Sequence, residues 1–290
     1  MTQSFTATGA SALAKTNEGS GRRVLVTGAA GRIGSYFARH AGTKYSLRLM
    51  VQRAEEGTAL RDFGEVVTSD LSDLQGVKAA CSGMDTVIHL AADPSPSATW
   101  DSLLPTNIVG TYNTFVAAKA GGCRRVIYAS SIHAVSGYPA DVQVKTSEPV
   151  NPGDLYGVSK CFGEAMGRYM AEQEGLSVIA LRIGAFQLLE AARDERSISM
   201  LDAFVSHRDL HHLIERCIDV ENLRFAILHG LSDNRFKRLD ISDARALVGY
   251  QPQDDLTQEN PRLKALDLGE TVTAHNLSDP GQESGLRQHV

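Results

Sequence analysis

The feature that most constrains the fold of this chain is a regular alternation of short apolar runs with longer amphipathic segments. The apolar runs cover residues 23–27, 47–51, 65–68, 86–90, 125–129, 177–181 and 224–230. Helical patterns cover residues 33–40, 74–81, 103–120, 155–174 and 203–219. Strands that alternate with helices form βαβ units, and buried parallel strands read as continuous apolar runs. The alternation therefore predicts an α/β fold with a doubly wound parallel sheet.

A glycine-rich loop follows the first predicted strand directly and leads into the first helix. Residues 27–34 read TGAAGRIG, with glycines at every third position. In the first βα turn of a Rossmann sheet, separate glycines make the tight turn, let the backbone approach a pyrophosphate and allow close helix–strand packing. The helix N-terminus adds free N–H groups and a partial positive charge. The loop therefore predicts a Rossmann fold that binds a dinucleotide at Gly28, Gly31 and Gly34.

The end of the second predicted strand bears on the choice between NAD and NADP. A carboxylate in this region normally binds the ribose hydroxyls of NAD. Here residues 50–53 read MVQR, and no acid occurs before Glu55. Arg53 is either a ligand of the 2′-phosphate of NADP or an ordinary solvent-exposed arginine. We therefore expect NAD or NADP as the cofactor, and the missing acid favours NADP.

Tyr156 and Lys160 have the spacing of a catalytic pair. Residues four apart on a helix lie on one face, which brings the ammonium group near the phenol. A nearby positive charge lowers the pKa of a tyrosine, ordinarily about 10, so that the phenolate can accept a proton from a substrate hydroxyl. Ser130 and Ser131 follow the fifth predicted strand, at the sheet edge where such folds bind ligands. A hydroxyl there either orients the substrate or simply caps the strand.

These motifs together resemble the extended short-chain dehydrogenases, the NAD-dependent epimerase/dehydratase family, over roughly residues 22–250. The resemblance is carried by TGAAGRIG at 27–34, Asp70-Leu71, HLAA at 89–92, Asn107, ASS at 129–131, YGVSK at 156–160 and the segment FVSHRDLHHLIERCI at 204–218. Within the family the chain looks most similar to uronate dehydrogenases and related sugar 1-dehydrogenases. That closer likeness is carried by SSIH at 130–133, LYGVSKCFGE at 155–164 and RIG at 182–184.

The resemblance implies a set of site residues. The implied catalytic residues are Ser131, Tyr156 and Lys160. The implied cofactor-binding residues are Gly28, Gly31, Arg32, Ile33, Gly34, Arg53, Asp70, Leu71, Leu90, Ala91, Ala92, Asn107, Tyr156 and Lys160. The implied substrate-binding residues are Ser131, Ile132, His133 and Arg182.

The substrate-binding assignments leave alternatives open. In uronate dehydrogenases the arginine that matches Arg182 holds the substrate carboxylate, but an arginine at a strand end also forms structural salt bridges. His133 either donates to or accepts from a sugar hydroxyl, or it is a packed polar residue. Ile132 stands where uronate dehydrogenases have an asparagine, which removes an amide that could touch the sugar.

The implied function is the oxidation of a uronate or aldose, or of a sugar phosphate, at its anomeric carbon to give the lactone. An epimerase or dehydratase acting on a nucleotide-linked sugar is the second hypothesis, and a non-catalytic NADP-binding sensor is the third. The segment between Arg182 and the polar C-terminal part of the chain, residues 183–254, is short beside the C-terminal domain that nucleotide-sugar enzymes of the family have, which favours a small substrate. The intact Tyr156/Lys160 pair favours an enzyme over a sensor.

The sequence also indicates how the chain is organised. We expect a flexible tail over residues 1–21, an NAD(P)-binding Rossmann domain with the catalytic residues over 22–183, a small substrate-binding region over 184–254 and a polar C-terminal tail over 255–290. No stretch approaches the ~20 apolar residues of a membrane helix. The net charge of −5 argues against non-specific nucleic-acid binding.

The four cysteines, Cys81, Cys123, Cys161 and Cys217, are widely spaced and form no CxxC pair. This spacing argues against a zinc site and against a disulfide framework. We therefore expect no metal. We expect a cytoplasmic homo-oligomer that has a small sugar or sugar acid as its partner, and neither nucleic acid nor membrane.

Overall fold

A computed structural model describes residues 21–267 and contains one large parallel sheet. Its strands are β1 (Arg23–Thr27), β2 (Ser46–Val51), β3 (Glu65–Thr68), β4 (Thr86–His89), β5 (Arg125–Ser131), β6 (Ser177–Ile183) and β9 (Phe225–Gly230). They lie in the order β3-β2-β1-β4-β5-β6-β9, and every neighbouring pair is parallel. The order reverses between β1 and β4, so the carboxyl ends of these two strands flank the position where such sheets bind ligands.

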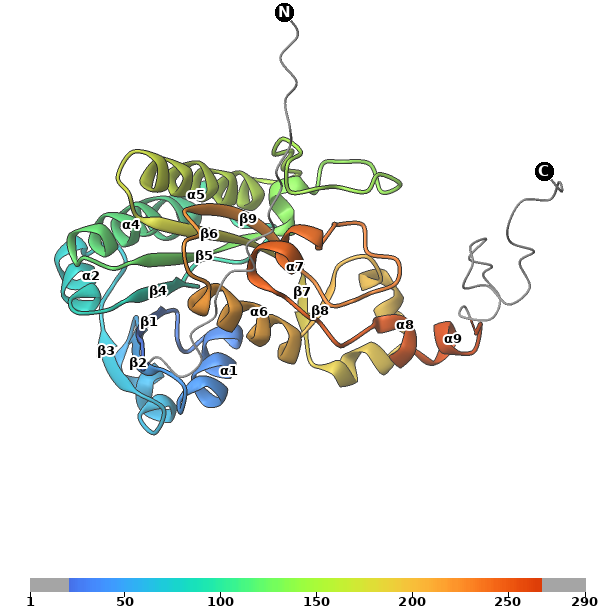
Figure 1. Cartoon of the computed structure of the whole chain (residues 1–290), viewed down its shortest axis with the longest axis horizontal. Coiled ribbons are helices and arrows are strands. Elements are labelled where there is room, and N and C mark those ends of the chain that lie inside the picture. The colour runs from blue at the N-terminus through green and yellow to red at the C-terminus, as the bar shows by residue number, and fades with distance from the viewer. Residues whose placement is uncertain (1–20, 268–290) are drawn as a thin grey trace, which may run out of the picture.

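Helices cover both faces of this sheet (Figure 1). The long ones are α1 (Arg32–Ala41), α2 (Leu74–Cys81), α4 (Gly110–Ala120), α5 (Leu155–Glu172) and α6 (His207–Asp219). On one face α1 and α6 bury side chains such as Phe37 and Leu213 in the same apolar cluster as Val26 of β1. On the other face α2, α4 and α5 bury Val77, Phe115 and Met170. The predicted doubly wound Rossmann architecture is confirmed.

The region after β6 is not separate from the main sheet. Strand β9 pairs with β6 and completes the sheet at that edge. Two short strands, β7 (Ala185–Gln187) and β8 (Phe204–Ser206), pair with each other in a second small sheet. Because β8 occupies residues 204–206, the helix predicted from residue 203 begins only at His207. The Ser206 hydroxyl caps this helix by accepting from the Asp209 amide at 3.1 Å. Helix α7 (Ser242–Val248) follows β9.

The helix predicted over residues 103–120 is divided. A single turn, α3 (Trp100–Leu103), passes into a π-helical segment over Leu104–Val109 and then into α4. Pro105 stands at the start of the π-helical segment, where its missing N–H cannot support a regular α-helical ladder. The shift in helical register changes which side chains of this segment face the sheet.

The polar tail that the sequence predicts from residue 255 does not begin there. Helices α8 (Leu256–Glu259) and α9 (Pro261–Lys264) follow Asp255, and Leu256 is fully buried beside Phe204. The buried Asn260 amide donates to the backbone oxygens of Ala192 and Asp194 and to the Ser197 hydroxyl. The prediction of a tail was wrong for residues 255–264, because the polar side chain of Asn260 makes internal hydrogen bonds there. The expected tails over residues 1–20 and 268–290 lie outside the described residues.

No helix within residues 21–267 is both long enough and apolar enough to cross a lipid bilayer. The four cysteines are free thiols, and Cys81, Cys123 and Cys217 are buried.

We predict that Asn260→Ala lowers the free energy of unfolding by about 1–3 kcal/mol, because the buried carbonyl oxygens lose their donor. Chemical denaturation measures the change. The control is Gln258→Ala, since Gln258 is exposed on neighbouring α8. Equal stability of the two variants would contradict the role of Asn260 as the contact that orders this region.

Candidate active site

The glycine loop has the geometry of a phosphate-binding turn. Gly28 adopts a φ of +65°, and a Cβ on it would lie 2.8 Å from the Ala91 backbone. A Cβ on Gly34 would lie 2.5 Å from the Gly28 carbonyl oxygen, so α1 packs against the loop only because both residues are glycine. No side chain caps the first turn of α1 at Gly31, and no acid lies in that turn. The loop therefore fits the pyrophosphate of a dinucleotide, with helix N–H groups available to it.

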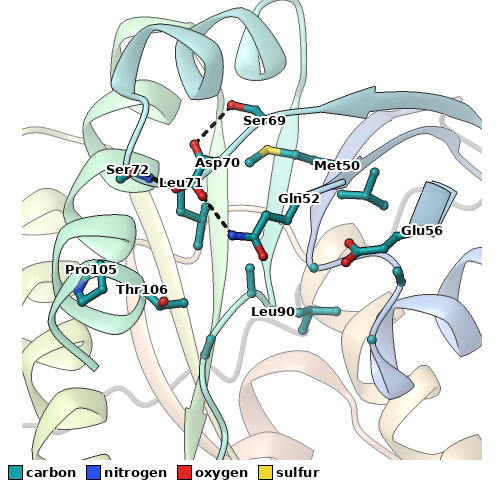
Figure 2. A pocket seen from close by; sticks show the side chains of 16 residues that line it. Met50, Gln52, Glu56, Ser69, Asp70, Leu71, Ser72, Leu90, Pro105 and Thr106 are labelled. Atoms are coloured by element: carbon teal, nitrogen blue, oxygen red, sulfur yellow. Dashed lines mark hydrogen bonds between the residues drawn. The ribbon is translucent and has the colours of Figure 1, made fainter. Parts of the chain in front are cut away.

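A cavity of about 490 Å³ lies beside the loop, where the carboxyl ends of β1 to β4 meet (Figure 2). Of the predicted cofactor residues, it is lined by Gly28, Gly31, Asp70, Leu71, Leu90, Ala91 and Ala92. It is also lined by residues that the sequence analysis missed, including Met50, Gln52, Glu56, Ser69 and Thr106. The cavity sits where the adenosine of a dinucleotide binds in a Rossmann fold.

Asp70 is held as a carboxylate at the wall of this cavity. Its Oδ1 accepts from the Ser72 hydroxyl at 2.7 Å and from the Ser72 amide at 2.8 Å, and its Oδ2 accepts from the Gln52 amide at 2.9 Å. These hydrogen bonds, first those from Ser72, hold the pKa of Asp70 below its ordinary value. Figure 2 shows the Gln52 side chain reaching toward Asp70. Gln52 and Asp70 thus form a fixed polar wall opposite the loop.

Arg53 does not line the cavity. Its side chain is 65% exposed and pairs with Glu56 at 2.6 Å and with Glu55 at 3.5 Å. Glu56 does line the cavity, as Figure 2 shows, so the β2 side of the cavity has an acid that comes from the turn after the strand rather than from the strand itself. Sequence reasoning missed Glu56 because it stands several residues beyond the usual position of the ribose-binding acid.

A second cavity, of about 610 Å³, adjoins the first, and Gly28, Gly31, Leu90 and Ala92 line both. It brings together the three predicted catalytic residues, Ser131, Tyr156 and Lys160. The predicted cofactor residues Arg32, Ile33 and Gly34 and the predicted substrate residues Ile132 and His133 also line it. Residues 183–187, from the last residue of β6 to the end of β7, complete the lining on another side.

Burial governs the chemistry of the Tyr156/Lys160 pair. The Lys160 ammonium donates to the Ala129 carbonyl oxygen at 2.8 Å and lies 5.4 Å from the centre of the Tyr156 ring. Burial lowers the pKa of Lys160 to about 7. Burial also raises the pKa of Tyr156, although a hydrogen bond with Ser131 acts in the opposite direction. Burial therefore opposes the expected lowering of the tyrosine pKa by a nearby positive charge, since desolvation disfavours the charged form of each residue.

His133 lies beside the pair. It is the second residue of a short 3₁₀ turn, Ile132–Val135, that follows β5, and its amide donates to the Ser131 hydroxyl oxygen at 3.2 Å. Its ring meets the Tyr156 ring edge-on, with centroids 5.4 Å apart. Ile132, Ser131 and His133 thus present one apolar and two polar side chains to the same cavity.

Asn107 is a correction to the predicted cofactor site. It lies in the π-helical segment, is almost fully buried and lines neither cavity. Its amide donates to the Ser159 hydroxyl at 2.9 Å and to the Asp93 carbonyl oxygen, while its Oδ1 accepts from the Asp93 amide at 2.8 Å. Asn107 therefore ties the loop after β4 to α5, and its contribution to the site is to fix the position of that loop.

Arg182 is the second correction. Its guanidinium makes two hydrogen bonds of 2.9 Å to the Glu164 carboxylate, and the side chains are 1% and 3% exposed. Ile183 lines the cavity, whereas Arg182 does not. Consecutive residues of a strand face opposite sides of a sheet, so Arg182 points toward α5 and away from Ile183. The structural salt bridge is thus the correct alternative, and the prediction of a substrate-binding Arg182 was wrong.

Residues 24–208 match the NAD dependent epimerase/dehydratase family. The chain belongs to that family. This agrees with the glycine loop and with the Tyr156/Lys160 pair, both of which lie within the matched residues.

Three relatives in this family are similar over most of the chain. An NAD-dependent glucose-6-phosphate dehydrogenase of Haloferax volcanii is 38% identical over 248 residues, which are 80% of this chain and 93% of that protein. An L-arabinose 1-dehydrogenase (NAD(P)⁺) of the same organism is 33% identical over 254 residues, covering 80% and 97%. The crystal structure of uronate dehydrogenase from Agrobacterium tumefaciens is 30% identical, covers 90% of this chain and 92% of its own, and has a TM-score of 0.72.

The described part of this family member, residues 21–267, contains no cluster of three or more His, Cys, Asp or Glu side chains arranged to hold a metal ion. His211 is half-buried on α6, and desolvation lowers its pKa to about 4.

We predict that Arg182→Met lowers the free energy of unfolding by about 3–5 kcal/mol, because the buried Glu164 carboxylate loses its partner. The double variant Arg182→Met/Glu164→Leu recovers most of the loss, and urea titrations of all three proteins measure it. Activity on charged and neutral sugars falls equally in the single variant. A selective loss on charged sugars in a fully stable Arg182→Met protein would contradict the structural role.

Proposed function

We propose that this protein oxidises a small sugar at its anomeric carbon and passes the hydride to NAD or NADP, which gives the lactone. The observation that carries the proposal is the convergence of Ser131, Tyr156 and Lys160 on a cavity continuous with the dinucleotide loop. The relatives named above are dehydrogenases of glucose 6-phosphate, L-arabinose and uronate, which supports sugar oxidation over nucleotide-sugar epimerisation. The substrate class is thus a uronate, an aldose or a sugar phosphate.

The size and lining of the cavity support a small substrate. Its volume of about 610 Å³ lies within the ordinary range for small-molecule sites, and the nicotinamide end of the cofactor takes part of it. Because Arg182 is paired with Glu164 and does not line the cavity, the basic residues that line it are Arg32, His133 and Lys160. Arg32 lies at the rim, where it donates to the Phe186 carbonyl oxygen at 2.8 Å. The guanidinium of Arg32 is therefore the group that can donate two hydrogen bonds to an acidic group of the substrate.

The chain's own residues supply proton transfer and orientation. The Ser131 hydroxyl orients the sugar hydroxyl and stabilises the Tyr156 phenolate through the hydrogen bond noted above. Tyr156 accepts the proton from the anomeric hydroxyl. Burial lowers the pKa of Lys160 to about 7, and in its protonated form Lys160 carries the positive charge that favours the phenolate. The bound nicotinamide supplies the hydride acceptor.

We propose that both NAD and NADP are accepted. Arg53 is solvent-exposed, and exposed ion pairs contribute little, so it can leave Glu55 and Glu56 for a 2′-phosphate at small cost. The nearby carboxylate of Glu56 favours NAD by repelling the same phosphate. Titration of the protein with each cofactor decides the preference.

We propose self-association through the outer face of α3 to α5. Seven large apolar or aromatic side chains of residues 100–169 in and between these helices are between 37% and 51% exposed, and a surface rich in exposed apolar groups favours association. They are Trp100, Leu104, Val109, Tyr112, Leu155, Val158 and Tyr169. We further place the protein in the cytoplasm, which the four free thiols support.

The test of function is a panel of aldoses, uronates and sugar phosphates, each with NAD and with NADP, read at the absorbance of the reduced cofactor. We predict turnover with at least one sugar, and that Tyr156→Phe lowers its rate about 10²- to 10⁴-fold while cofactor affinity stays nearly unchanged. The matched control is Tyr169→Phe, since Tyr169 lies on the same helix but is exposed to solvent. Turnover of Tyr156→Phe at the wild-type rate would remove Tyr156 from the mechanism.

We predict that light scattering gives the mass of at least a dimer, and that Tyr112→Glu/Val158→Glu yields the monomer because two charges then enter the apolar contact. The control Phe236→Glu changes an exposed aromatic residue outside this surface. A monomeric wild-type protein would contradict the proposed interface.

A further inference from the structure

His133 is anchored to the start of α5 through one carboxylate. Asp154 is the N-cap of α5, and its Oδ1 accepts from the Gly157 amide at 2.7 Å. Its Oδ2 lies 2.6 Å from His133 Nδ1. The same side chain therefore fixes the first turn of the helix that carries Tyr156 and the ring beside Tyr156.

The two segments approach so closely that little freedom remains between them. A Cβ on Gly157 would lie 2.3 Å from the His133 carbonyl oxygen. The His133 ring is further confined by its edge contact with Tyr156. The side chains of His133 and Asp154 are nevertheless 30% and 23% exposed, and His133 lines the cavity that holds Tyr156 and Lys160. The imidazole is thus held in place and still accessible to a ligand.

The partner of Nδ1 determines what Nε2 can do. An ionised carboxylate only accepts hydrogen bonds, so Nδ1 carries the proton in the contact with Asp154. In the neutral imidazole the other ring nitrogen, Nε2, is then an acceptor. Within residues 21–267 the hydrogen bonds of the His133 side chain are made by Nδ1 alone. Nε2 therefore remains as an acceptor for a donor that enters the cavity.

We propose that Asp154 is a positioning residue that fixes the tautomer of His133, so that Nε2 accepts a hydrogen bond from one hydroxyl of the sugar. The inference rests on the proposed sugar oxidation and adds a specificity rule to it. A sugar hydroxyl can donate to Nε2, whereas a hydrogen in its place cannot. The pair therefore selects for that hydroxyl, in addition to the contacts that Ser131 and Tyr156 make with the reacting one.

Asp154→Asn separates this role from the role in capping α5. Asparagine is also a good N-cap, so the Gly157 amide keeps its acceptor. The remaining amide nitrogen is a donor, and it favours the imidazole with its proton on Nε2. Asp154→Ser serves as a second variant, because serine also caps the helix but lacks a carboxylate for Nδ1.

The first measurement compares the best sugar of the panel with each of its monodeoxy analogues. In the wild-type protein, kcat/KM for one analogue falls about 10- to 100-fold below that of the parent sugar. In Asp154→Asn and in His133→Phe the parent sugar falls to the level of that analogue, while thermal stability and cofactor affinity stay unchanged. Wild-type discrimination retained in Asp154→Asn would overturn the proposal.

The second measurement needs no substrate. Nitrogen-15 NMR of the histidine rings, with the His133 signals assigned by their loss in His133→Gln, reports which nitrogen is protonated. We expect the proton on Nδ1 in the wild-type protein and on Nε2 in Asp154→Asn. A proton on Nε2 in the wild-type protein would overturn the tautomer assignment. Absence of turnover with every sugar would instead count against the proposed function, so the two failures are distinguishable.

Discussion

A buried ion pair holds the two strands and the helix that build the catalytic centre. Glu164 of α5 binds Arg182 of β6 and also accepts from the Ser130 hydroxyl of β5 at 2.6 Å. Ser130 and Arg182 are paired in the sheet, so one carboxylate joins both strand ends to the helix. Their neighbours Ser131 and Ile183 are also paired, and both line the cavity. The geometry of the site therefore depends on an ion pair, Arg182 with Glu164, that does not itself line the cavity.

The same helix places three functional side chains along one line. Tyr156, Lys160 and Glu164 follow one another at intervals of four residues, which stacks them on one face of α5. Glu164 secures this face to the sheet, Lys160 reaches the Ala129 carbonyl oxygen, and Tyr156 reaches the cavity. The depth of burial decreases along this line from the ion pair to the tyrosine. Burial is also what brings the pKa of Lys160 to about 7, within reach of neutral-pH chemistry.

The sequence predicts most of this fold because the strands are buried and the loops carry glycine. The ranges of β1, β3 and α2 agree with those predicted, and the loop, Tyr156, Lys160 and His133 meet around two joined cavities. Contacts between segments distant in the sequence were not predictable from local patterns. In the sequence, Asn107 looks like a ligand contact and Asn260 like a loop residue. In the structure, the side-chain amide of each is buried and donates to a backbone carbonyl oxygen. Arg182 was misassigned because a charged residue at a strand end suggests a ligand. Arg182 and Ile183 face opposite sides of the sheet, and Glu164 lies on the same face of α5 as Tyr156. These two features together indicate the internal pair of Arg182 and Glu164.

The internal use of Arg182 has a consequence for how the site recognises its substrate. Nε and Nη2 of Arg182 bind the Glu164 carboxylate at 2.9 Å, and this ion pair reduces the attraction that the guanidinium exerts on an acidic sugar in the cavity. Inside the cavity the Lys160 ammonium donates to the Ala129 carbonyl oxygen, and Arg32 lies at the rim. The other polar groups available to the sugar are neutral, namely the hydroxyls of Ser131 and Tyr156 and the ring nitrogen of His133. When a ligand lacks a hydroxyl, the neutral acceptor that would bind it is left desolvated and unpaired, and binding weakens. Neutral groups of this kind therefore distinguish ligands by their hydroxyls more sharply than by their charge. The arrangement of hydroxyls around the ring therefore contributes more to selection inside this cavity than the charge at the far end of the sugar does.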